Sequence, residues 1–227
     1  MAGERAVAAA VVAVVLAGAV AACGETVYVQ QEDAGRPPDA GLEEDAPPCG
    51  PDVYPCPPYG VVAETVFEDL TFTGWVDDDQ SGDPLDDDFR IWAMDVFYQR
   101  GHGGQAKFLY LNVSAGWCTV CQAENRQLPS YFAEFNSQGI DFGEILFETY
   151  NQNEPATQEF GREWTDYYNL PFPVGLDPSF KTGRYFDKAA TPANIIIDLR
   201  TMKIVSVGVG WSDSSARATL AAMAATP

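Results

Sequence analysis

Five apolar runs along the chain predict buried β-strands. Residues 106–115 (AKFLYLNVSA) and 140–150 (IDFGEILFETY) are rich in aromatic and β-branched side chains, which favours strand over helix. Residues 172–177 (FPVGLD) predict a shorter strand. Residues 192–198 (PANIIID) and 203–211 (KIVSVGVGW) are separated by a short connection and predict a hairpin.

Helical patterns lie between and after these runs. Apolar residues recur at i, i+3, i+4 and i+7 over residues 128–135, which marks one face of a helix, and Pro129 is expected to kink it. Residues 154–168 predict a second helix, and residues 178–187 predict a short one. Residues 212–225 begin with a serine cap and predict a helix at the end of the chain.

This order of elements predicts an α/β fold. Strands that alternate with helices and then end in a hairpin and a helix are typical of a central mixed sheet flanked by helices on both faces. The chain has 227 residues, of which 46% are hydrophobic and 12% aromatic, enough for one domain with appendages. The residues that follow strand 106–115 are expected at the carboxyl edge of the sheet, where α/β folds build their sites.

Charge is distributed unevenly along the chain. The formal net charge is −20, and 18 of the 33 acidic residues fall between positions 24 and 90. Such acidity disfavours binding to nucleic acid, which needs clustered lysine and arginine, and docking on anionic lipid. From position 91 onwards, 14 acidic and 10 basic residues give a net charge of −4, which is typical of an ordinary globular surface.

The N-terminus predicts export. Residues 1–22 combine a weakly charged start, an apolar run and small residues at its end, as in a secretory signal peptide, with an uncleaved membrane anchor as the alternative. The sequence Val20-Ala21-Ala22-Cys23 resembles the bacterial lipobox. That resemblance implies cleavage before Cys23, lipidation of Cys23, and anchoring in the bacterial cell envelope, on the periplasmic side or at the outer membrane.

The segment after Cys23 predicts a tether. Residues 23–57 are acidic and rich in proline and glycine, and residues 24–48 have too few large aliphatic side chains to offset the chain entropy of folding. We therefore expect a disordered linker there, followed by a domain over residues 58–227.

The chain has five cysteines. If Cys23 carries lipid, the other four form two pairs. Cys49 and Cys56 flank a turn-rich loop and predict a structural disulfide in an oxidising compartment. Closing a loop of this size contributes about 2–3 kcal/mol in the chain-entropy model. A zinc site formed by Cys49, Cys56, Cys118 and Cys121 is the alternative, but the gap between the first two does not match the usual ligand spacing.

Cys118 and Cys121 form a C-x-x-C pair where a predicted strand ends and a helix begins. Free amides at a helix N-terminus stabilise an anion, which favours ionisation of Cys118 as the attacking thiolate. Cys121 lies one turn further in and can resolve a mixed disulfide. Trp117 is expected to pack beside the sulfur and shield it. Two unreactive thiols are the alternative, although this position is typical of thioredoxin-like redox pairs.

Glu124 follows Cys121 by one helical turn, and two interpretations stay open. A carboxylate at this position could accept the proton of the inner thiol, or raise thiol pKa values by repulsion. A solvated helix glutamate explains the same residue without a role in chemistry.

The stretch FLYLNVSAGWCTVCQAE resembles the thioredoxin superfamily, in particular the redoxin or TlpA-like branch of envelope thiol-disulfide oxidoreductases. That branch shows a strand and then N-F-W-A-x-W-C-x-P-C-x-x-E, which is matched here by Asn112, Ala115, Trp117, Cys118, Cys121 and Glu124. The resemblance extends from about Pro58 to Ala225 and implies a thioredoxin-like fold, a redox-active disulfide and no organic cofactor. Val120 replaces the usual proline, which leaves the redox potential and direction open.

The same resemblance assigns a role to Pro192, which follows Thr191 before a predicted strand. It implies a cis-proline that lies beside the disulfide and helps to bind the partner's chain. From the sequence alone, an ordinary proline at the start of a strand is the alternative.

Two other features of the sequence bear on metal binding. Asp77–Asp88 partly fits a calcium loop, but Pro84 and Asp88 break the pattern, so a solvated acidic turn is the preferred interpretation. His102, the only histidine, lies in a glycine-rich segment interpreted as an exposed loop. A single histidine there also disfavours a copper-delivering relative of this fold, and no metal is assigned.

Together these features predict a lipid-anchored thiol-disulfide oxidoreductase of the cell envelope. Its expected partners are envelope protein thiols and disulfides, together with a membrane or envelope electron donor. One alternative is a thiol peroxidase of the peroxiredoxin type, whose cysteine normally follows Pro-x-x-x-Thr-x-x. Another is a redox-inert binding lipoprotein with a thioredoxin-like fold.

Overall fold

A computed structural model describes residues 49–104 and 106–226. The expected signal peptide, the lipobox with Cys23 and the expected tether up to residue 48 lie outside the described residues. Within the described ranges, no helix combines the length and the apolar character that crossing a membrane requires.

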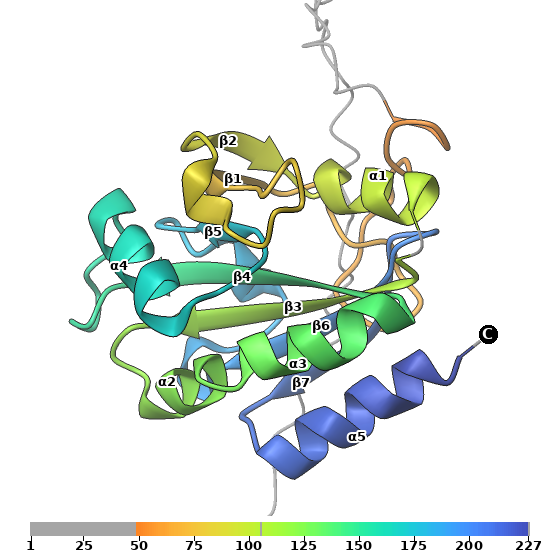
Figure 1. Cartoon of the computed structure of the whole chain (residues 1–227). Helices are drawn as coiled ribbons and strands as arrows, with labels where there is room; N and C mark the ends of the chain where they lie inside the picture. The colour runs from red at the N-terminus through yellow and green to blue at the C-terminus, as the bar shows by residue number, and fades with distance from the viewer. Residues whose placement is uncertain (1–48, 105, 227) are drawn as a thin grey trace, which may run out of the picture. The chain divides into compact units, whose positions relative to one another are not determined.

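A seven-stranded mixed sheet forms the centre of the domain (Figure 1). Its strands are β1 (Thr71–Trp75), β2 (Arg90–Ala93), β3 (Phe108–Ala115), β4 (Ile140–Glu148), β5 (Val174–Leu176), β6 (Ala193–Asp198) and β7 (Lys203–Val209). They are arranged in the order β2-β1-β5-β4-β3-β6-β7. β3, β4 and β5 run parallel, and the other neighbouring pairs are antiparallel.

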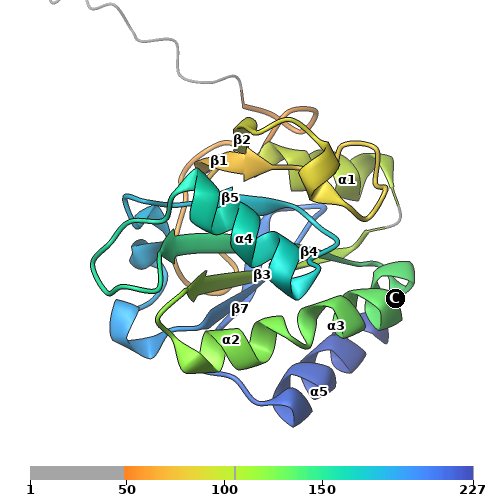
Figure 2. The ribbon, with the colours of Figure 1, turned by 60° about the vertical axis from the view of Figure 1, so that its left-hand side comes forward.

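Helices cover both faces of this sheet (Figure 2). Those in the described residues are α1 (Asp95–Gly103), α2 (Thr119–Asn125), α3 (Leu128–Phe135), α4 (Gln158–Tyr168) and α5 (Asp213–Ala224). One core contains side chains of α1 and of the segment that precedes β1, and the other contains side chains of α3, α4 and α5. The predicted α/β class, with helices on both faces of a mixed sheet, is confirmed.

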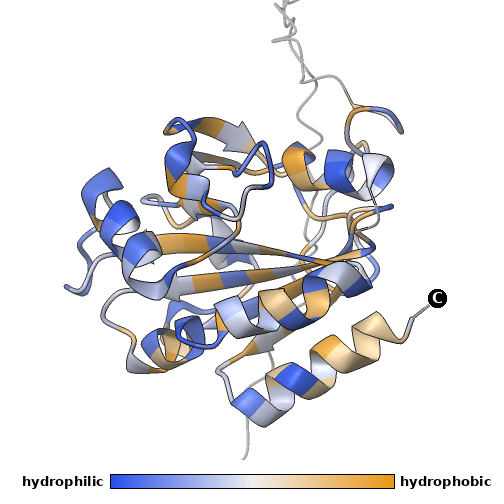
Figure 3. Ribbon diagram, in the orientation of Figure 1, coloured by the Kyte–Doolittle hydropathy of each residue, from blue (hydrophilic) through white to orange (hydrophobic). Residues whose placement is uncertain are grey.

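Both faces of the central strands are buried, which is why their sequences are continuous apolar runs. In β3, Leu109 and Leu111 face one core, whereas Phe108 and Tyr110 face the other. Every residue of β3 and β4 is buried. Figure 3 shows these hydrophobic strands next to the largely polar outer surface of α4. The carboxyl ends of β3 and β4 are therefore a rigid support for the residues that follow them.

The helix predicted over residues 128–135 is confirmed, but the kink expected at Pro129 is wrong. α2 ends at Asn125 and α3 begins at Leu128, with Pro129 in the first turn of α3. In that turn the amide that proline lacks would have no helical partner, so proline starts a helix rather than kinking one.

Two more segments differ from the sequence prediction. The helix expected over residues 178–187 is wrong, and a 3-10 turn covers Lys181–Arg184 instead. The buried carboxylate of Asp177 accepts hydrogen bonds from the amides of Lys181 and Thr182, and these bonds close the chain into a turn. His102 is exposed, as expected, but lies in the last turn of α1 rather than in a loop.

The folded unit begins earlier than the predicted boundary at Pro58. Cys49 and Cys56 are joined by a disulfide. Between them, Tyr54 is 2% exposed, and its hydroxyl donates a hydrogen bond to the carbonyl of Phe67 at 2.9 Å. Residues 49–57 therefore pack on the domain and are not part of a tether.

Candidate active site

The C-x-x-C pair lies at the carboxyl edge of the sheet, where β3 ends at Ala115 and α2 begins at Thr119. The connection passes close to the end of β4. A Cβ on Gly116 would lie 2.7 Å from the carbonyl carbon of Thr149, so only glycine allows this approach of the two backbones. The amide of Trp117 donates a hydrogen bond to the carbonyl of Thr149 at 3.1 Å, which fixes the start of the motif.

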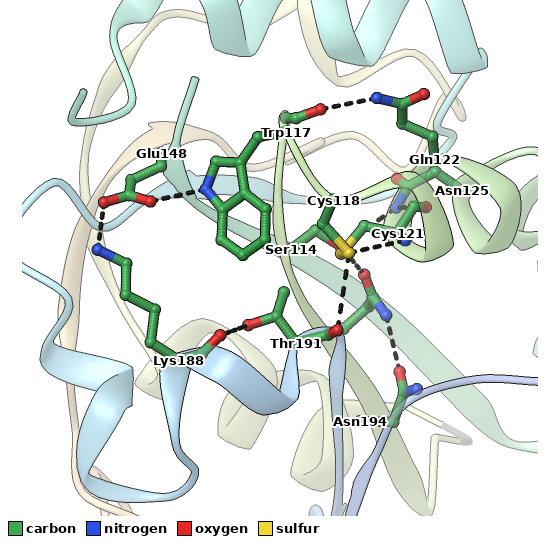
Figure 4. The surroundings of a disulfide bond; sticks show 12 residues. Ser114, Trp117, Cys118, Cys121, Gln122, Asn125, Glu148, Lys188, Thr191 and Asn194 are labelled. Carbon is green, nitrogen blue, oxygen red and sulfur yellow. Dashed lines mark hydrogen bonds and ion pairs between the residues drawn. A yellow bond between two sulfur atoms is a disulfide. The ribbon is translucent and has the colours of Figure 1, made fainter. Parts of the chain in front are cut away.

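The two sulfur atoms differ in accessibility. Cys118 and Cys121 are joined by a disulfide, with their Cα atoms 5.2 Å apart. Cys118 is 5% exposed, whereas Cys121 has no exposed surface. Cys118 is also the N-cap residue of α2, and its Sγ accepts a hydrogen bond from the amide of Cys121 at 3.1 Å (Figure 4). A partner therefore reaches the sulfur of Cys118 first, and an amide N–H group already points at it.

An ion pair anchors Trp117. Its indole Nε1 donates a hydrogen bond to Oε2 of Glu148 at 2.7 Å, and the other carboxylate oxygen pairs with Nζ of Lys188. Although burial raises the pKa of Glu148, the hydrogen bonds from Lys188 and Trp117 outweigh burial and hold that pKa below its usual value. Figure 4 shows the indole between this ion pair and Cys118, so the ring is held beside the disulfide.

The loop before β6 lies on another side of Cys118. The peptide bond between Thr191 and Pro192 is cis, and β6 begins at the next residue. The carbonyl oxygen of Thr191 lies 3.6 Å from Sγ of Cys118. The hydroxyl of Thr191 donates a hydrogen bond to the carbonyl of Lys188 at 2.8 Å, which connects this loop to the ion pair that holds Trp117.

Glu124 lies in the core, with no exposed surface. Its Oε1 accepts a hydrogen bond from the hydroxyl of Tyr110 at 3.0 Å, whereas Oε2 has no hydrogen-bond partner among the described residues. Burial raises the pKa of Glu124 to about 7, and hydrogen bonding from Tyr110 opposes part of this rise. The interpretation as a solvated helix glutamate is therefore wrong, because the carboxyl group faces β3 and not water.

A row of polar side chains crosses the sheet on the same face as Glu124. Glu144 of β4, Asn112 of β3 and Asn194 of β6 lie side by side in the strand register, and we refer to them as the polar row. The Nδ2 of Asn112 donates a hydrogen bond to Oδ1 of Asn194 at 2.8 Å. Glu144 is fully buried, and burial raises its pKa well above the usual value.

Asn125 connects the polar row to the C-x-x-C helix. Its Nδ2 donates hydrogen bonds to the carbonyl of Cys121 at 3.1 Å and to Oε1 of Glu144 at 3.4 Å. Its Oδ1 accepts a hydrogen bond from the indole of Trp164 in α4 at 2.9 Å. α4 therefore supports the end of α2, and a buried carboxyl group lies within two hydrogen bonds of the inner cysteine.

Comparison with known proteins finds similarity in structure only. No family model and no curated protein matches the sequence. A candidate thiol:disulfide interchange protein, DsbE, from Chlorobium tepidum superposes with a TM-score of 0.52 at 15% identity, covering 74% of this chain and 99% of that one. A secreted thiol-disulfide isomerase from Corynebacterium glutamicum superposes with a TM-score of 0.51 at 15% identity, covering 69% of this chain and 83% of that one. A candidate protein disulfide isomerase from Bacteroides thetaiotaomicron superposes with a TM-score of 0.51 at 19% identity, covering 73% of this chain and 87% of that one.

The chain has the thioredoxin-like fold. Low sequence identity limits this finding to architecture. Within that architecture the C-x-x-C pair occupies the junction between β3 and α2, as the resemblance implied. Val120, which stands between the cysteines, is 41% exposed and adds apolar surface next to Cys118.

Several residues around the site of this thioredoxin-like domain were missed by sequence reasoning: Tyr110, Asn125, Glu144, Glu148, Lys188 and Asn194. One of them carried a signal. Glu144 is a charged residue near the middle of an apolar strand, where an acidic side chain is uncommon unless it has a partner. Glu148 and Lys188 are 40 residues apart, so no local pattern connects them.

The acidic turn between β1 and β2 is a separate feature. Carboxylate oxygens of Asp77, Asp79 and Asp87 lie within 4.8 Å of one another. Asp77 is only 3% exposed, so the expected solvated turn is wrong at this residue. Its carboxylate accepts hydrogen bonds from Ser81 and Gly82, which explains its burial as a turn-closing group.

Proposed function

We propose that this protein is a thiol-disulfide oxidoreductase that acts through Cys118 and Cys121. The observation that carries the proposal is the asymmetry of the disulfide, in which Cys118 is 5% exposed and Cys121 is fully buried. An outer sulfur can meet a partner, and a buried one can only react with its neighbour. Structural neighbours whose names describe thiol-disulfide interchange or isomerase proteins support the same chemistry.

The exchange conserves atoms and electrons. The thiolate of Cys118 attacks a partner disulfide, a mixed disulfide forms, and one partner sulfur leaves as a thiolate. Cys121 then loses its proton to a base and attacks Sγ of Cys118, which releases the second partner thiolate. Two electrons pass from the dithiol to the partner, and the Cys118–Cys121 disulfide forms. The reverse sequence oxidises a partner dithiol, and the relative reduction potentials decide the direction.

The surrounding groups divide this work. The amide of Cys121, 3.1 Å from Sγ of Cys118, stabilises the outer thiolate. Glu124 lies one turn beyond Cys121 on α2 and, with a pKa of about 7, accepts the proton of the inner thiol near neutral pH. Trp117 and Pro192 form the walls against which the partner's chain docks.

The proposed location is the bacterial cell envelope, with a lipid on Cys23 as the anchor. Two disulfides in the described part of the chain fit an oxidising compartment. Partners would then be envelope protein thiols and disulfides and an envelope or membrane electron donor.

Metabolic labelling with a radioactive fatty acid tests the anchor: the wild-type chain incorporates label, and Cys23→Ser does not. Equal labelling of both chains would contradict the lipid assignment.

Trapping tests the roles of the two cysteines. Without the resolving thiol, Cys121→Ala should accumulate mixed disulfides with partner proteins through Cys118. Non-reducing electrophoresis detects these as bands that disappear on addition of dithiothreitol. The matched variant Cys118→Ala leaves a buried thiol and should trap little. Equal trapping by Cys118→Ala would reverse the roles, and no trapping by either variant would oppose the proposed function.

A further inference from the structure

The proposed exchange needs a route for protons. Cys121 releases a proton each time the disulfide forms and takes one up each time it is reduced. Cys121 and Glu124 both have no exposed surface. On the partner's side the opening is the 5% of Cys118 that remains accessible, and a mixed disulfide covers this opening. A proton held by Glu124 during the reaction must therefore leave in another direction.

A cavity reaches the neighbours of Glu124 from the side of β7 and α5. It measures about 140 Å³, which is enough for several water molecules. Exposed residues of β7 and of the start of α5 form its rim, so water enters freely. Its inner wall includes Tyr110 and Asn194. The residues that flank Cys118 on the partner's side, Trp117, Thr191 and Pro192, do not line it.

Hydrogen-bonding groups connect this wall to the buried carboxyl group. The hydroxyl of Tyr110 donates to Oε1 of Glu124 at 3.0 Å. Asn194, also in the wall, accepts a hydrogen bond from Asn112 at 2.8 Å and belongs to the polar row. Tyr110 thus touches both the cavity and Glu124, so one side chain spans the distance between them.

Gly208 keeps the cavity open. It lies opposite Asn194 in the β6–β7 register and so continues the polar row without a side chain. The nearest atom to a Cβ built on Gly208 is the carbonyl oxygen of Asn194, at 3.8 Å, which is an ordinary contact distance. A larger residue therefore fits at this position and would extend into the cavity.

We infer that this cavity is the proton outlet of the site, and that Tyr110 is the positioning residue that connects Glu124 to its water. The inference rests on the proposed function. In the resolving step the S–H proton of Cys121 passes to Glu124, the Cys121 sulfur bonds to Sγ of Cys118, and the partner leaves as a thiolate. Glu124 then passes the proton along the Tyr110 hydrogen bond to cavity water, and no other reactant is needed.

The electrostatic surroundings agree with this route. The titratable groups that act on Glu124 are Tyr110 of β3 and Glu144 of β4, with Tyr131 of α3 next to Tyr110. These groups bring no cation to the carboxyl. Burial raises the pKa of Glu124 to about 7, so near neutral pH it can both accept and release a proton.

Stopped-flow kinetics with a nitrobenzoate aromatic disulfide test the inference. The first coloured thiolate released by the reduced protein reports attack by Cys118, and the second reports resolution by Cys121. Tyr110→Phe removes the hydroxyl, and Gly208→Leu fills the cavity. Both should slow the second release by about tenfold or more, because a general acid–base path typically contributes at least that much. The first release should keep its wild-type rate.

Controls and a pH profile separate this role from a merely structural one. Val205→Leu changes an exposed position of the same strand outside the cavity and should leave both releases unchanged. Loss of the Tyr110 hydrogen bond should raise the pKa of Glu124, so the pH midpoint of the second release should move upward in Tyr110→Phe. If Gly208→Leu proves unstable in thermal unfolding, Tyr110→Phe decides alone.

The outcomes are distinguishable. No thiolate release from the reduced wild-type protein would overturn the proposed function, and the outlet with it. A normal first release with equal second releases in wild type, Tyr110→Phe and Gly208→Leu would overturn the outlet alone. Slowing by Glu144→Gln, with none by Tyr110→Phe, would place the proton path on the polar row and would also overturn it.

Discussion

Two buried carboxyl groups near the disulfide differ in their ionisation. Glu148 is 5% exposed and Glu124 is fully buried, so both lose most of their hydration. Lys188 and Trp117 bind Glu148, and its pKa lies below the usual value. Glu124 has a neutral phenol as its partner, and its pKa rises to about 7. Burial is common to both, and the presence of a cation decides which form is stable.

The difference assigns the two groups to different tasks. A carboxylate that stays ionised over the working pH range holds its partners in one geometry, and Glu148 holds Trp117 beside Cys118. A carboxyl group with a pKa near neutrality changes its protonation during a reaction, and Glu124 is suited to that. The site therefore has a fixed wall beside the disulfide and a titrating group one helical turn beyond Cys121 on α2.

The largest expected effect concerns Glu124 and pH. Its pKa is about 7 in the folded protein and 4.5 without the fold, so the unfolded chain loses its proton first as pH rises. The free energy of unfolding should therefore fall by about 3 kcal/mol across this interval, at about 1.36 kcal/mol per pKa unit. At pH values below the pKa of Glu124 in the unfolded chain, the full contribution of Glu124 to stability is present. Glu124→Gln removes this dependence and should gain stability over wild type as pH rises.

Urea unfolding of the oxidised protein measures this from about pH 4 to about pH 8. Glu159→Gln, an exposed glutamate of α4, is the matched control and should keep the wild-type profile. Glu144 also has a raised pKa, so the slope that remains in Glu124→Gln reports that residue. Parallel profiles for wild type and Glu124→Gln would mean that Glu124 is not buried as described.

A smaller effect is expected when the cation beside Glu148 is removed. In Lys188→Met the carboxyl group loses its positive partner, so its pKa should rise. The stabilisation that ionised Glu148 gives above its unfolded pKa should then be lost. The free energy of unfolding should fall by only about 1 kcal/mol at neutral pH, because Lys188 is partly exposed and its charge is screened. The indole N–H signal of Trp117 in NMR should titrate with Glu148 and follow this shift. Lys203→Met, which removes a lysine 3.9 Å from the exposed Glu64, should leave that signal unchanged.

The contrast between the two carboxyl groups also explains what the sequence could predict. The C-x-x-C pair and the order of strands and helices follow from local patterns, and the structure places Cys118 at the predicted strand–helix junction. The role of Glu124 stayed open because α2 has only seven residues, too few for periodicity to say which face is buried. Its environment depends on Tyr110, which is one of several aromatic residues in an apolar run.

Other parts depend on contacts between distant segments. Glu148 and Lys188 meet only after β4 and the loop before β6 are in place, and each looks like a surface charge in the sequence. β1 and β2 are short and are separated by a long acidic turn, so no signal in the sequence indicated that they pair as antiparallel strands. Tyr54 lies in a segment rich in proline and cysteine that resembles a linker, and its burial comes from packing against residues far along the chain. Composition describes such segments poorly because tertiary contacts decide their state.

An exposed carboxylate sharpens the comparison with the smallest expected effect. Asp78 accepts hydrogen bonds from Nη2 of Arg90 at 2.7 and 2.8 Å, while 55% of its side chain and 41% of that of Arg90 remain exposed. Water already solvates both groups, so Asp78→Asn should change the free energy of unfolding by less than about 1 kcal/mol. Added salt should reduce even this difference, since exposed charges are screened. Urea unfolding at low and high salt measures it. A loss as large as the pH effect of Glu124 would show that the distance between charges, and not burial with the choice of partner, governs these carboxylates, and the contrast between Glu124 and Glu148 would lose its explanation.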